Sequence, residues 1–75
     1  MRRFLVVVEK AGANYSAYSP DLPGCVATGS TPEETTKRMQ AAIAMHLDGL
    51  REDHLPIPDG SATAEYIEVG STDGA

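Results

Sequence analysis

A carboxylate and a thiol stand four residues apart in the run Pro20-Asp21-Leu22-Pro23-Gly24-Cys25. Asp21 could act as a general acid or base, and Cys25 could act as a nucleophile. However, a lone Asp between two prolines and near a glycine more often accepts hydrogen bonds from backbone N–H groups in a turn. A free Cys without a neighbouring His or Lys usually packs as a small apolar residue. The residue types therefore favour a structural role for both side chains.

The remaining candidates for chemistry are two histidines, a helix start and scattered acids. His46 and His54 are eight residues apart, and no third ligand has a spacing that would complete a zinc site. A helix start after Gly29 could bind phosphate through its free N–H groups, but Glu33 and Glu34 place two negative charges at that end. We therefore expect no catalytic residue, no cofactor and no metal ion.

The elements that position these residues begin with three predicted strands. Residues 4–8 are a continuous, β-branched apolar run, which predicts a first strand buried on both faces. A turn at residues 11–14 leads to a second strand at 15–19. Two prolines exclude residues 20–24 from a ladder, so we expect a loop there and a short third strand at 25–28.

A long helix follows. Thr31 is a candidate N-cap, Pro32 suits the first helical position, and Glu34 completes a capping box. An apolar stripe of helical period then predicts a helix over residues 32–52, about 30 Å long; its members are Met39, Ala42, Ile43, His46, Leu47 and Leu50.

A fourth strand is predicted at residues 64–69, where Ile67 and Val69 alternate with Glu68. The expected fold is therefore α+β, in the order β-β-β-α-β, with one helix packed on one face of the sheet. Because a single helix covers a single face, the other face of the apolar first strand should meet another subunit or a partner.

Composition limits the possible functions. Seventy-five residues form one domain with a marginal core, so self-association or a partner is expected. Residues 48–75 carry seven acidic and one basic side chain within a net charge of −5, which favours basic partners and disfavours nucleic acid. The apolar run at the N-terminus is too short for export or for crossing a membrane. A single cysteine fits a reducing cytoplasm.

Several of these motifs together resemble the HicB family of bacterial antitoxins. The resemblance rests on Tyr15-x-Ala17, the Pro-Asp-Leu-Pro-Gly-Cys run, Gly29-x-Thr31-x-Glu33-Glu34, the helix exit from His46 to Asp53, and Pro56-Ile57-Pro58. It covers about residues 3–69 and implies a degenerate, partial ribonuclease-H-like domain that has lost catalysis. Such a domain binds and masks HicA, a small basic RNA-cleaving toxin.

The resemblance also sets expectations for domains and sites. Residues 1–69 should form the antitoxin domain and 70–75 a flexible tail, with no C-terminal DNA-binding domain of the kind that many HicB proteins carry. Where the family often has glycine after the helix, this chain has His54, so another helix end is expected. The expected partner-binding residues lie in the loop and at the helix end: Pro20, Asp21, Leu22, Pro23, Gly24, Asp48, Glu52 and Asp53.

These observations predict an antitoxin that neutralises a HicA-like toxin and forms a homodimer or homotetramer. Two alternatives remain at this stage. One is a solitary HicB-like oligomeric adaptor without a toxin. The other is a residual metal-dependent nuclease, disfavoured because the first strand lacks an acid and because Glu9, Glu34 and Asp48 form no convincing metal set.

Overall fold

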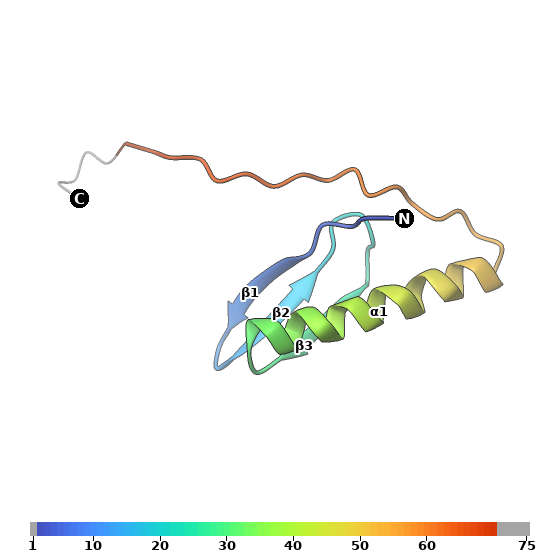
Figure 1. Ribbon diagram of the computed structural model, residues 1–75, viewed down its shortest axis with the longest axis horizontal. Helices are drawn as coiled ribbons and strands as arrows, with labels where there is room; N and C mark the ends of the chain where they lie inside the picture. The colour runs from blue at the N-terminus through green and yellow to red at the C-terminus, as the bar shows by residue number, and fades with distance from the viewer. Residues whose placement is uncertain (1, 71–75) are drawn as a thin grey trace.

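The computed structural model describes residues 2–70 and contains a three-stranded antiparallel sheet with one helix packed against it (Figure 1). The strands are β1 (Val7–Ala11), β2 (Asn14–Tyr18) and β3 (Val26–Gly29), and the helix is α1 (Pro32–Glu52). The sheet order is β1-β2-β3, so each strand pairs with its neighbour in sequence. The predicted α+β class and the order of three strands and a helix are confirmed.

The register of the hairpin explains why β1 begins later than the apolar run predicted. Gly12 has a φ of 63°, which lets a two-residue turn connect Ala11 to its partner Asn14. Counting back from that turn, the last pair is Val7 with Tyr18, after which the second strand leaves the sheet. Residues 4–6 are therefore assigned no strand, although they continue the direction of β1.

The core lies between the sheet and α1. Buried side chains from β2, from the loop that follows it and from α1 meet there, and Phe4, Val6 and Val8 pack against them from the N-terminal segment and β1. The buried apolar set is Ala17, Leu22, Cys25, Met39 and Leu47. Val7 pairs across the sheet with Tyr18, which in turn pairs with Val26, so these three share the face opposite the helix. Tyr18 and Val26 are exposed there, and the first strand is only half-buried, not buried on both faces as predicted.

Helix α1 has the predicted bounds because both ends are capped by their own sequence. Thr31 Oγ1 accepts the Glu34 N–H at 3.0 Å, and the Glu34 carboxylate accepts the backbone N–H of Ser30 at 3.0 Å. The capping box is thus displaced by one residue, since its acid reaches Ser30 and not the N-cap itself. This hydrogen bond, together with the Arg38 guanidinium at 3.4 Å, holds the pKa of Glu34 below its ordinary value.

The helix ends in a Schellman motif with histidine in the place that glycine usually takes. His54 has a φ of 57°, its N–H donates to the Arg51 carbonyl, and the Leu55 N–H donates to the Leu50 carbonyl at 2.9 Å. The expectation of a different helix end was therefore wrong: histidine replaces glycine, but the chain still forms the Schellman geometry. His54 carries the cost of a left-handed conformation that glycine would avoid.

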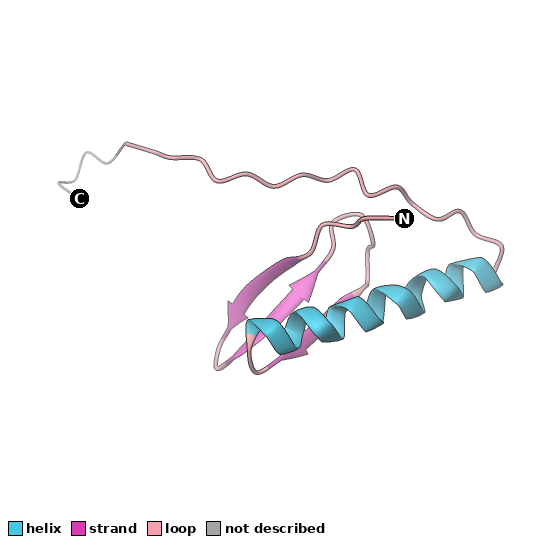
Figure 2. Ribbon diagram, in the orientation of Figure 1, coloured by secondary structure: helices cyan, strands magenta, loops and turns pink. Residues whose placement is uncertain are grey.

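The segment after α1 differs from the prediction. Residues 64–69, predicted as a fourth strand, run as an extended chain that pairs with no strand among residues 2–70 (Figure 2). They run beyond the sheet, which contributes to a radius of gyration of 15.5 Å, against about 11 Å for a compact chain of this length. Apart from Gly70, the predicted tail at 70–75 lies outside the described residues.

Candidate protein-interaction surface

The loop between β2 and β3 is built from two successive turns. The Leu22 N–H donates to the Ser19 carbonyl and the Cys25 N–H donates to the Leu22 carbonyl, each at 3.1 Å. Gly24 has a φ of 82°, a left-handed conformation that favours glycine at this position. Leu22 is only 1% exposed, so this loop inserts an apolar anchor into the core while its prolines stay at the surface.

Asp21 connects this loop to the segment that follows the helix. Its carboxylate accepts the backbone N–H of Ala62 at 3.1 Å and the hydroxyl of Ser61 at 3.3 Å. The acceptor role in a turn was expected for Asp21, but the donors lie about forty residues away in sequence and not in the loop itself. Asp21 therefore fixes the course of the chain beyond the helix.

Cys25 is a core residue. Its side chain belongs to the buried apolar cluster, and burial raises the pKa of the thiol. A thiol with a raised pKa is protonated at neutral pH and is a poor nucleophile. This placement agrees with the structural role that the sequence favours.

A shallow hollow lies where the loop approaches α1. It has a volume of about 270 Å³ and is lined by the loop end at Gly24 and Cys25, by the start of β3 at Val26, and by Ala42, Met45 and His46 of the helix. Met45 is 74% exposed, so a large apolar side chain stands at the surface beside this hollow. Exposed apolar residues next to a hollow are typical of protein contact sites.

Acidic side chains continue from this hollow along the helix. Met45, Asp48 and Glu52 follow one another at steps of three and four residues, so they share one face of α1. Asp48 accepts a hydrogen bond from Arg51 at 3.1 Å, and Glu52 and the C-cap Asp53 are exposed. We call Met45, Asp48, Glu52 and Asp53 the helix-face surface; it combines an exposed apolar side chain with carboxylates that suit a basic partner.

The eight predicted partner-binding residues fall into three groups. Pro20, Pro23 and Gly24 are exposed in the loop, and Asp48, Glu52 and Asp53 are exposed at the helix end. Asp21 and Leu22 are occupied inside the molecule by the chain's own segments. The loop and the helix thus meet at the hollow through Gly24.

Sequence reasoning missed Met45. Met45 lies outside the apolar stripe, at a helix position where the helical period predicts a polar residue. An apolar side chain at such a position could have indicated a contact surface.

Metal binding, anion binding at the helix start and membrane insertion find little support in the part of the chain that the structure describes. No group of three or more His, Cys, Asp and Glu side chains within residues 2–70 is arranged to hold a metal ion. At the start of α1, the carboxylate of Glu34 already accepts the Ser30 N–H that an anion could bind. In the same described region, no helix has the length and apolarity needed to cross a membrane.

Comparison with known families identifies the chain. Residues 4–74 match the model of the HicB-like antitoxin of bacterial toxin-antitoxin systems. The chain belongs to the HicB-like antitoxin family. The resemblance seen in the loop and the helix exit is thereby confirmed over almost the whole sequence, and membership of this family implies a toxin partner.

Curated relatives of this HicB-like antitoxin carry no more specific description. A UPF0150 protein of Synechocystis sp. is 34% identical over 88% of this chain and 85% of its own length. A UPF0150 protein of Helicobacter pylori is 39% identical over 65% of this chain and 68% of its own length.

An uncharacterized 14.9 kDa protein from the rep-hol intergenic region of Haemophilus phage HP1 is also similar. It is 32% identical over 83% of this chain. The match covers 47% of that relative, so this chain spans about half of its length. No solved structure gives a significant match.

Proposed function

We propose that this chain is the antitoxin of a type II toxin-antitoxin pair and neutralises a HicA-like, mRNA-cleaving toxin by covering its active surface. In this proposal it acts in the cytoplasm as a homodimer or homotetramer, without catalysis of its own. The observation that carries the proposal is the family match over residues 4–74 in a chain whose helix end is acidic and exposed.

Charge supports a basic partner. Enzymes that cleave RNA need cationic surfaces to hold the phosphate backbone, and a net charge of −5 favours association with such a surface. On the helix-face surface, carboxylates at Asp48 and Glu52 would meet the basic groups while Met45 supplies apolar contact. Bound through this surface, the antitoxin would compete with RNA for the toxin's cationic groups.

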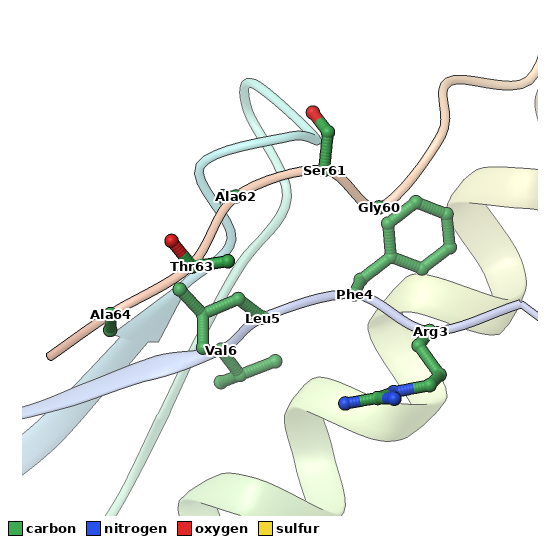
Figure 3. Close-up of a pocket in the computed structure, with 9 residues that line it drawn as sticks. All are labelled: Arg3, Phe4, Leu5, Val6, Gly60, Ser61, Ala62, Thr63 and Ala64. Atoms are coloured by element: carbon green, nitrogen blue, oxygen red, sulfur yellow. The ribbon is translucent and has the colours of Figure 1, made fainter.

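The architecture supports the absence of catalysis. The order of three antiparallel strands and a helix, followed by an extended segment whose residues 60–64 lie beside residues 3–6 (Figure 3), agrees with a partial ribonuclease-H-like sheet. An active enzyme of that architecture would need converging carboxylates. Glu9, Glu34 and Asp48 lie on β1, at the start of α1 and near its end, so the structure distributes them along the molecule.

The test begins with co-expression of this chain and the protein encoded by the reading frame beside its gene, which the proposal expects to be short and basic. A hetero-complex of defined mass in light scattering, and a neighbour that cleaves RNA alone but not when paired, are the expected results. A neighbour that cleaves RNA equally fast with excess of this chain present would overturn the proposal and favour the solitary oligomeric adaptor.

Matched variants locate the contact. The double reversal Asp48→Lys with Glu52→Lys should weaken binding of the toxin at least tenfold, because it places cations against a cationic surface. Glu9→Lys with Glu33→Lys makes the same change in net charge at exposed positions away from this surface and should weaken binding much less. Equal losses for both pairs would assign the effect to net charge and remove the helix-face surface from the proposal.

A further inference from the structure

The chain beyond the helix ends in an apolar, strand-like segment that nothing else within residues 2–70 covers. Tyr66, Ile67 and Val69 are 105%, 81% and 83% exposed. Solvated tails are poor in aromatic and β-branched residues, and these residue types are enriched in strands. We call residues 64–69 the C-terminal strand segment. Its composition indicates a strand that pairs with another chain when the protein acts.

The C-terminal strand segment starts from a fixed point. Asp21 accepts the Ala62 N–H at 3.1 Å, and Gly60 lies so close to Arg3 that a Cβ on Gly60 would collide with the Arg3 carbonyl. Figure 3 shows these two stretches of backbone side by side, and Figure 1 shows the chain continuing from there beyond the sheet. A partner would therefore meet a strand whose origin is already ordered, which lowers the entropy cost of binding.

Both edges of the protein's own sheet carry charged side chains. At β3, the Arg38 guanidinium donates to the Thr28 carbonyl at 3.1 Å. At β1, the neighbouring residues Glu9 and Lys10 are exposed. Charged side chains on an edge strand discourage the addition of another strand. The sheet of a second copy is therefore a poor place for the C-terminal strand segment.

Charge also disfavours pairing between the C-terminal strand segments of two copies. The segment contains Glu65 and Glu68 and no cation, so two such segments side by side would bring carboxylates together. A basic protein has the opposite charge and would attract the same segment. Charge complementarity therefore selects a basic partner as the occupant.

We propose that the C-terminal strand segment adds as a strand to an exposed sheet edge of the basic partner. In such strand addition, main-chain hydrogen bonds supply affinity and alternate side chains contact the partner's surface. Glu65, Ile67 and Val69 share one face of an extended strand, and Tyr66 and Glu68 share the other. Each face thus brings one carboxylate and apolar contact area to the partner. The inference rests on the proposed function and adds a contact that is distinct from the helix-face surface.

The first experiment measures binding of the full chain to the protein encoded beside its gene by calorimetry. Ile67→Pro removes a backbone donor and an apolar side chain, and it should weaken binding roughly tenfold or more. Gly70→Pro places a proline just beyond the segment, where an extended preceding residue tolerates it, and should weaken binding less than about threefold. Because the segment is exposed, both variants should keep the amide protection of α1.

The outcomes separate this inference from the proposed function. If Ile67→Pro binds and neutralises the neighbouring protein as well as the wild type does, strand addition is refuted and the antitoxin assignment stands. If the wild type itself does not bind that protein, both proposals fail. If Ile67→Pro instead dissociates an oligomer that the wild type forms alone in light scattering, the segment pairs with a second copy and the inference is wrong.

The second experiment tests the strand geometry. An edge-added strand directs only every second N–H group toward its neighbour. In a complex of isotope-labelled chain with the unlabelled neighbouring protein, hydrogen exchange should therefore slow at alternate amides of residues 64–69 and remain fast at the amides between them. Uniform protection, or none, would refute strand addition even where the two proteins bind.

Discussion

Removal of the Asp21 carboxylate tests the link between the loop and the C-terminal segment. Asp21→Ala deletes two hydrogen bonds, one from the Ala62 N–H at 3.1 Å and one from the Ser61 hydroxyl at 3.3 Å. A hydrogen bond to a charged group contributes about 1.5–3 kcal/mol, and the exposed, longer bond to Ser61 lies near the lower limit for any hydrogen bond, about 0.5 kcal/mol. We therefore expect the free energy of opening for this segment to fall by about 2 kcal/mol.

Hydrogen exchange measures this opening directly. A loss of about 2 kcal/mol raises the exchange rate of the Ala62 amide about thirtyfold, while amides in the middle of α1 keep their protection because the core is unchanged. Ser61→Ala removes only the weaker bond and should raise that rate about two- to threefold. If Asp21→Ala leaves the Ala62 amide as protected as in the wild type, the carboxylate does not hold the segment.

Three further predictions concern the ends of the helix and its packing on the sheet. His54→Gly should raise the free energy of unfolding by about 1 kcal/mol in urea titrations, because glycine takes the left-handed φ of 57° without strain. Gly29→Ala should lower it by about 1–3 kcal/mol, since its new Cβ would lie 2.6 Å from Thr35 Oγ1 in a packed region. Glu34 has a folded pKa below its ordinary value, so its stabilising contribution is complete above the ordinary value and is lost as pH falls through the folded pKa. Glu34→Gln should therefore unfold with a weaker dependence on pH in the acid range, and an unchanged dependence would contradict the capping geometry.

The parts of the fold that the sequence predicted are those with local causes. Helix α1 begins where Thr31 and Glu34 cap it, and it ends where the apolar stripe ends, because caps and periodicity act within a few residues. The start of β1 was predicted too early because apolar character alone does not fix register. The turn at Gly12 and the exit of β2 at Tyr18 decide it.

The candidate surface was only partly predictable for the same reason. The acids at the helix end are local features of composition, and they are exposed as expected. Leu22 is buried by segments distant in sequence, and the hydrogen-bond donors to Asp21 lie about forty residues away. A local sequence pattern cannot predict either contact. The prediction of a fourth strand at residues 64–69 was wrong for the same reason: alternation is a local pattern that contains no information about a pairing strand, and these residues pair with no strand among residues 2–70.

The Pro-Asp-Leu-Pro-Gly-Cys run contacts both the core and the segment that follows the helix. Leu22 and Cys25 anchor the loop in the core, Gly24 supplies the left-handed turn, and Asp21 holds the chain at Ala62. The course of the C-terminal segment is therefore set by a loop that is itself fixed in the core.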